Sequence, residues 1–164
     1  MPYDITTRHV QDQLVVSVRA ETTMAGLSSF VGETIGTLIS RLQRVGVAPD
    51  GHVLVIYHAV DPNRIDAEVA VPVSAHVDLD VLARAGLAVR VVPAATVAQT
   101  HHVGPYEGLP EAYRALAGWL SEHGVATVGP TRERYQVGFG DGVPESAFLT
   151  QIEWPIAEAR VPVH

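Results

Sequence analysis

The chain has 164 residues, a formal net charge of −7 and no cysteine, and 47% of its residues are hydrophobic. This size suits one domain. No run reaches the roughly 18 apolar residues that span a bilayer, and the N-terminus lacks the basic and apolar regions of a signal peptide. The missing cysteines exclude disulfides and thiolate metal sites, and these absences together lead us to expect a cytoplasmic protein. The acidic charge argues against nonspecific binding to nucleic acid.

Hydrophobic periodicity divides the first half of the chain into a strand, a helix and two further strands. Apolar and polar residues alternate over 14–21, which predicts a half-buried strand. Apolar residues recur at helical spacing over 35–42, and the runs 53–60 and 64–73 predict a pair of strands. We interpret residues 74–86 as a linker to the second half.

The second half predicts the same order of elements. Residues 87–103 are extended, and Pro93 interrupts any hydrogen-bonded ladder there. A helix is expected over 110–124, because Pro110 suits a helix start and Gly124 a helix end. The runs 131–139 and 148–156 predict the closing pair of strands.

A shift of 78 residues superimposes the two halves. It matches three pairs: Gly46 with Gly124, Gly51 with Gly129, and Tyr57 with Tyr135. From Pro72 to Pro155 the shift is 83, so five residues have been added in the second hairpin connection, residues 138–147. Such a repeat predicts the architecture.

The repeat predicts an α+β fold built from a duplicated strand–helix–strand–strand module with pseudo-twofold symmetry. We expect a single domain over 1–164, with half-repeats at about 4–73 and 87–157. The two units would form one antiparallel sheet with both helices on one face. The opposite face, near the pseudo-axis, would then be concave and available for a ligand.

Glu133 breaks the symmetry of the repeat, because the shift of 78 places it on Val55. Strand geometry puts it on the same face as Thr131, Tyr135 and Val137. One interpretation is a solvated glutamate on an edge strand. The other is a carboxylate in a cleft, where desolvation would raise its pKa and where it would pair with a cation or act as a general base.

Four aromatic residues are candidates to line such a cleft, although aromatic residues also serve as plain core. They are Tyr57, Tyr106, Tyr135 and Trp154. Tyr113 and Trp119 belong to the predicted helix, and we interpret them as packing residues.

Two other patterns carry no chemistry. His101 and His102 are adjacent in a predicted strand, so their side chains point to opposite faces and make a poor chelate. The glycines of residues 138–142 are not followed by a helix, and Asp141-Gly142 is typical of a hairpin turn. We expect no metal and no cofactor.

Several runs together resemble the GyrI-like small-molecule-binding domain, which is also the effector-binding domain of bacterial multidrug-responsive transcription activators. The resemblance covers about residues 4–157. It is carried by HVGPYEGLPEAY (102–113), Gly129-Pro130, Glu133 with Tyr135, TQIEWPI (150–156), Tyr57-His58 and EVAVPV (68–73).

This resemblance implies a ligand cleft between the halves that receives a hydrophobic or aromatic small molecule, in many relatives a cationic one. The family glutamate corresponds to Glu133, and Tyr135, Tyr57 and Trp154 correspond to wall positions. The chain departs from the family at Gln151, where a glutamate is usual, which puts a preference for strongly cationic ligands in doubt. Glu153 faces the same side as Gln151 and is expected to replace that carboxylate in part.

Three functions follow from the resemblance. The first is a small-molecule binder that senses or sequesters a compound. The second is a hydrolase of electrophilic cyclopropane-containing compounds, with Glu133 and either Tyr135 or Tyr57 activating water. The third is a gyrase-inhibitor-like protein, which no motif supports.

The resemblance and the predicted sheet also bear on partners. The resembled fold begins near residue 1 and leaves no room for a helix-turn-helix module, so we expect no direct DNA binding. Open sheet edges are compatible with a monomer or a homodimer.

Overall fold

The computed structural model describes residues 3–138 and 140–158. The predicted domain therefore extends beyond the described residues at both ends, and Phe139 of the predicted strand 131–139 lies outside them. The strands are β1 (Thr6–Val10), β2 (Gln13–Thr22), β3 (Leu54–Asp61), β4 (Arg64–Pro72), β5 (Val89–Val92), β6 (Ala95–Val103), β7 (Thr131–Val137) and β8 (Leu149–Pro155). The helices are α1 (Leu27–Arg44), α2 (Leu79–Arg84) and α3 (Leu109–Glu122), with single 3₁₀ turns at Tyr106–Gly108 and Glu145–Ala147.

The predicted elements are present, with three differences. Strand β1 was not predicted, because it carries little apolar patterning and is exposed over most of its length. The helix predicted from residue 35 begins at Leu27. The expected linker 74–86 contains α2, whose first turn is capped by the Asp78 side chain accepting a hydrogen bond from the Asp80 N–H at 2.9 Å.

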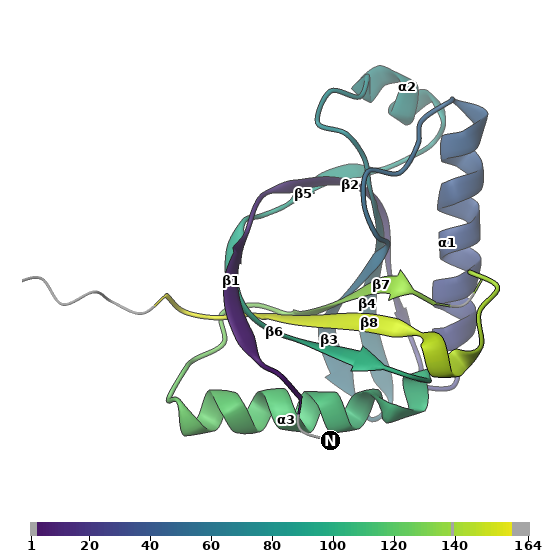
Figure 1. Cartoon of the computed structure of the whole chain (residues 1–164). Helices are drawn as coiled ribbons and strands as arrows, with labels where there is room; N and C mark the ends of the chain where they lie inside the picture. The colour runs from purple at the N-terminus through teal and green to yellow at the C-terminus, as the bar shows by residue number, and fades with distance from the viewer. Residues whose placement is uncertain (1–2, 139, 159–164) are drawn as a thin grey trace, which may run out of the picture.

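All eight strands form one curled antiparallel sheet in the order β1-β6-β8-β7-β3-β4-β2-β5 (Figure 1). The central neighbours β3 and β7 come from different halves of the chain. At the edges, β1 from the first half pairs with β6 of the second, and β5 pairs with β2 of the first. This order agrees with the predicted duplication, which stays a prediction, and it places the junction of the halves at the β3–β7 pair.

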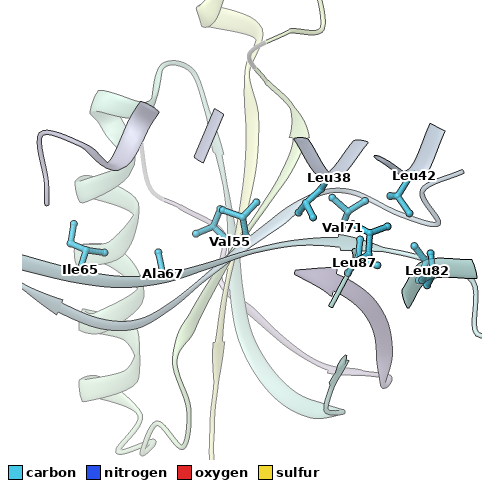
Figure 2. Close-up of a cluster of buried hydrophobic side chains, with 11 residues drawn as sticks. Leu38, Leu42, Val55, Ile65, Ala67, Val71, Leu82 and Leu87 are labelled. Carbon is cyan, nitrogen blue, oxygen red and sulfur yellow. The ribbon is translucent and has the colours of Figure 1, made fainter. Parts of the chain in front are cut away.

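Both long helices pack on the same face of the sheet, as predicted. Leu38 and Leu42 of α1 belong to one buried cluster with Val55 and Val71 of the sheet (Figure 2). On the other half, the buried side of α3 packs against Ile152 of β8. The face is the same because Val55 lies opposite Glu133 across the β3–β7 pair, and Glu133 lies opposite Ile152 across β7–β8.

The opposite face of the sheet carries a separate apolar cluster of Val15, Leu54, Ile56, Ala70 and Val92. The edge strands β1 and β5 curl around this side, away from α1 and α3 (Figure 1). Buried polar side chains on this face come from β4, β7 and β8: Glu68, Arg132, Gln151 and Glu153. In the described part of the chain, no helix is long and apolar enough to cross a membrane.

Candidate functional site

Glu133 lies in the middle of the sheet, directly opposite Val55, the residue that the repeat assigns as its counterpart. It is only 5% exposed, and β7 is an interior strand, so the interpretation as a solvated glutamate on an edge strand is wrong. The expectation that the site faces away from the helices is also wrong. The strand phase that buries Val55 under α1 places Glu133 on the helix-bearing face.

Three tyrosine hydroxyls surround the Glu133 carboxylate. Tyr135 donates to Oε1 over 2.9 Å, and Tyr57 lies 3.5 Å from the same oxygen. The hydroxyl of Tyr113, which comes from α3, donates to Oε2. Elements of both halves thus converge on one carboxylate: β3 and β7 from the sheet, and α3 from above it.

The negative charge of the Glu133 carboxylate is only partly compensated by its neighbours. Burial raises the pKa of Glu133, and the hydrogen bonds from Tyr113, Tyr135 and Tyr57 oppose that rise only in part. Burial and the nearby Glu133 charge also raise the pKa of each tyrosine, so all three stay neutral donors. Among the ion pairs of the described residues, none includes Glu133.

Tyr113 is the site residue that sequence reasoning missed. It belongs to the apolar stripe of α3 with Leu116 and Leu120, so its spacing predicted plain packing. Its ring does pack in that cluster, but its hydroxyl reaches across to the sheet. The shift of 78 residues offered a signal, because it pairs Tyr113 with Ile35 just as it pairs Glu133 with Val55.

Tyr106 and Trp154, the other predicted wall residues, lie at different distances from the carboxylate. The Tyr106 ring packs edge-on against Tyr135, with centroids 5.8 Å apart, and against Phe148 at 5.1 Å. Trp154 shares the helix-bearing face, because it is two residues from Ile152, but it packs into the α3 cluster. Tyr106 therefore borders the site through Tyr135, whereas Trp154 lies further along the sheet.

Gln151 and Glu153 lie on the opposite face of the sheet from Glu133, so their predicted place in the same cleft is wrong. Gln151 pairs across the sheet with Arg134, and Glu153 pairs with Arg132, while the intervening Ile152 pairs with Glu133. Side chains alternate along a strand, so residues on either side of Ile152 must face away from it. Glu153 cannot supply a second carboxylate to Glu133.

Glu153 instead belongs to a buried cluster on that opposite face. Arg134 Nε donates to Glu153 Oε1 over 2.5 Å, and Arg134 Nη1 donates to the Gln13 side chain over 2.9 Å. Arg132 lies 4.0 Å from the other Glu153 oxygen, which accepts no hydrogen bond from the described residues. Gln151 joins a neutral amide chain with Gln99 and Gln136.

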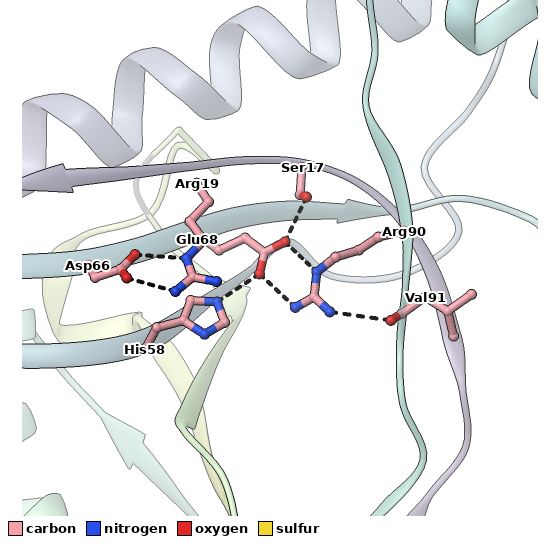
Figure 3. A network of polar contacts seen from close by, with 7 residues as sticks. All are labelled: Ser17, Arg19, His58, Asp66, Glu68, Arg90 and Val91. Atoms are coloured by element: carbon pink, nitrogen blue, oxygen red, sulfur yellow. Dashed lines mark hydrogen bonds and ion pairs between the residues drawn. The ribbon is translucent and has the colours of Figure 1, made fainter.

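A second buried carboxylate, Glu68, lies on the same opposite face in the first half (Figure 3). Arg90 binds it through two hydrogen bonds of 2.6 Å, Ser17 donates over 2.7 Å, and His58 Nε2 lies 2.9 Å away. Burial raises the pKa of Glu68, but these donors outweigh it and lower the pKa to about 2. Glu68 lines a hollow of about 370 Å³ together with Arg19 and these donors.

The histidine pair is arranged as its spacing predicts. His102 is buried on the helix-bearing face, whereas His101 pairs with Gln151 and is exposed on the other side. Among the described residues, no three His, Asp or Glu side chains are placed to hold a metal ion together.

Comparison with solved structures gives the same fold at low sequence identity. The EcmrR C-terminal domain matches with a TM-score of 0.80 and 19% identity over 97% of this chain and all of that one. In an EcmrR–DNA complex the match spans 58% of the EcmrR chain. SAV2435 bound to tetraphenylphosphonium matches at 0.69 and 14% identity, over 96% of this chain and 94% of that one.

A hydrolase encoded by lin2189 from Listeria innocua also matches, with a TM-score of 0.71 and 10% identity over 95% of this chain and 93% of that one. No curated protein sequence matches this chain. The model of the GyrI-like small molecule binding domain, by contrast, matches residues 3–157. The chain therefore belongs to the GyrI-like small-molecule-binding domain family.

Proposed function

We propose that this protein senses or sequesters a hydrophobic, aromatic small molecule that presents a positive charge or hydrogen-bond donors to Glu133. The observation that carries the proposal is a buried carboxylate whose hydrogen-bond partners, among the described residues, are only tyrosine hydroxyls. Burying a carboxylate costs free energy unless it is paired. A cationic or donor group brought by a ligand would compensate that cost, which gives the site an affinity for such compounds.

The tyrosine rings add to this preference. Aromatic faces attract cations, and tyrosine supplies contact area together with a hydroxyl that can keep its bond to the carboxylate. Tyr57 and Tyr135 are partly exposed, unlike Glu133 between them. A ligand that packs on these rings would therefore reach the carboxylate edge.

The α1 side of the site supports an apolar portion in the ligand. Phe30, Val31 and Ile35 are only partly buried and pack in the same cluster as Tyr57 and Tyr135. The two sides of the junction thus differ, with apolar side chains under α1 and the polar Tyr113–Glu133 pair under α3. An amphipathic ligand matches this division.

The test compares two probes of one shape and opposite charge. Tetraphenylphosphonium should bind and raise the melting temperature, whereas tetraphenylborate should not. Glu133→Gln should weaken tetraphenylphosphonium binding at least about tenfold, equivalent to roughly 1.4 kcal/mol. Glu122→Gln, which changes an exposed glutamate, is the matched control. Equal binding of the two probes, or full affinity in Glu133→Gln, would sink the proposal.

A hydrolase is the second candidate, supported by one feature of the same site. A glutamate whose pKa is raised by burial is suited to accept a proton from water, and the hydroxyls of Tyr57 and Tyr135 lie beside it. Turnover of an electrophilic cyclopropane compound, lost in Glu133→Gln, would favour this reaction. Saturable binding with no product would favour the binder.

A further inference from the structure

His102 lies on β6 two strands away from Tyr135, in the same row across the sheet. Both residues pair with Thr150 of β8, so they share the helix-bearing face. His102 is 6% exposed, and among the described residues it forms no hydrogen bond with Glu133. Its partners are the N-terminal segment and the turn that precedes α3.

The two ring nitrogens of His102 have fixed roles. Nε2 lies 3.0 Å from the carbonyl oxygen of Pro105, which only accepts, so Nε2 carries the proton and donates it. Nδ1 then accepts the hydrogen bond from the Tyr3 hydroxyl at 2.9 Å. The ring also lies against Gly108, where an added Cβ would be 2.6 Å from His102 Cε1.

The turn that His102 holds supplies two parts of the site. Tyr106 in this turn packs on Tyr135, and the turn leads directly into α3, which carries Tyr113 to Glu133. A shift of the turn would move both tyrosines relative to the carboxylate. The position of α3 above the sheet therefore depends on a contact at its first residues as well as on its apolar stripe.

We propose that His102 is a positioning residue of the ligand site: it fixes the Pro105–Gly108 turn and thereby aligns Tyr106 and Tyr113 with Glu133. This inference rests on the proposed function. Its required features are a proton donor at the Nε2 position and the absence of a side chain at Gly108. The Nδ1 contact with Tyr3 is not required for the alignment.

Two substitutions at His102 distinguish the role of Nε2 from that of Nδ1. In His102→Gln the amide nitrogen occupies the Nε2 position and keeps the bond to Pro105, whereas in His102→Asn the shorter amide reaches only the Nδ1 position. Hydrogen exchange of the backbone amides of residues 106–109 and 111–113 should accelerate in His102→Asn and stay near wild type in His102→Gln. Tetraphenylphosphonium affinity should fall about tenfold in His102→Asn and stay within about twofold of the wild type in His102→Gln.

His101→Asn is the matched control, because its side chain is exposed on the other face. Gly108→Ala should reproduce the His102→Asn result with the imidazole intact, while Gly118→Ala, on an open helix surface, should not. Equal exchange in the two His102 variants, or unchanged affinity despite faster exchange, would overturn the inference. If the wild type binds no probe, the proposed function fails, and the exchange comparison still decides whether His102 holds the turn.

Discussion

Two of the buried carboxylates, Glu133 and Glu68, lie on opposite faces of one sheet and have hydrogen-bond donors of different charge. Within the described part of the chain, Glu133 receives hydrogen bonds from neutral hydroxyls only, so burial prevails and its pKa is raised. Glu68 receives a bidentate pair from Arg90, with Ser17 and His58, and its pKa falls to about 2. Burial alone does not decide the charge of a carboxylate; the charge of its donors does.

The difference separates a carboxylate that cationic donors compensate within the fold from one that has only neutral donors among the described residues. Glu68 is 2% exposed and has both oxygens engaged, so its network ties β2, β3, β4 and β5 together. Glu133 has no cation to satisfy it among the described residues. A site that leaves a buried charge in this state sacrifices stability, which is a common feature of functional sites.

The largest effect is expected at Glu68. Glu68→Gln would place amide hydrogens against Arg90 and His58 and should lower the free energy of unfolding by about 3 kcal/mol at neutral pH. Because the folded pKa is depressed, the stability from Glu68 is present above about pH 4 and is lost as the pH falls toward 2. The free energies of unfolding of the wild type and Glu68→Gln, measured with urea, should therefore converge between pH 7 and pH 2. Glu122→Gln should follow the wild type throughout. A constant difference at every pH would contradict the ionised assignment.

Glu133→Gln should raise the free energy of unfolding, by less than Glu68→Gln lowers it. The folded pKa of Glu133 is raised, so its contribution favours the fold below about pH 4, and stability is lost as the pH rises through the folded pKa. A neutral amide avoids that loss, and it keeps one acceptor oxygen for Tyr113 or Tyr135 while its NH2 group faces the other hydroxyl, which can accept from it. We expect a gain of roughly 1 kcal/mol at neutral pH, with a smaller difference in acid. A loss of stability at neutral pH would show that the carboxylate is compensated.

Much of the fold could be predicted from the sequence because its strands and helices have clear periodicity. The apolar stripe of α1 and the alternation in β4 each specify one buried face. Strand β1 and helix α2 could not be predicted in this way. One is an exposed edge strand held by its pairing with β6, and the other is a single short helix whose start depends on the Asp78 cap.

For the site, the repeat identified Glu133, Tyr57 and Tyr135, because a polar residue in an otherwise apolar row is visible in the sequence. The face it occupies was mispredicted, since the choice of which face the helices cover depends on how β3 and β7 pair between halves. Gln151 and Glu153 were misplaced for a related reason: their phase relative to Glu133 requires the β7–β8 register. Tyr113 required the tertiary position of α3.

The three tyrosines around Glu133 provide the finest test of the comparison with Glu68. Each Tyr→Phe change removes one donor, so the pKa of Glu133 should rise further, by more for Tyr113 and Tyr135 than for Tyr57, whose hydroxyl is 3.5 Å away. We expect stability losses of about 1 kcal/mol for the first two and less for the third. These losses should grow with pH, because the hydroxyls stabilise the ionised form.

Carbon-13 NMR of the Glu133 side-chain carboxyl across a pH titration measures the change in the pKa of Glu133 directly. Phe148, which packs on Tyr106 without a hydroxyl, offers the control Phe148→Leu for loss of aromatic packing alone. An unchanged titration of Glu133 in Tyr113→Phe would mean that this hydroxyl does not bind the carboxylate in solution. The order of the stability losses, Tyr113, Tyr135 and then Tyr57, would then have to be explained by packing and not by donation to the carboxylate.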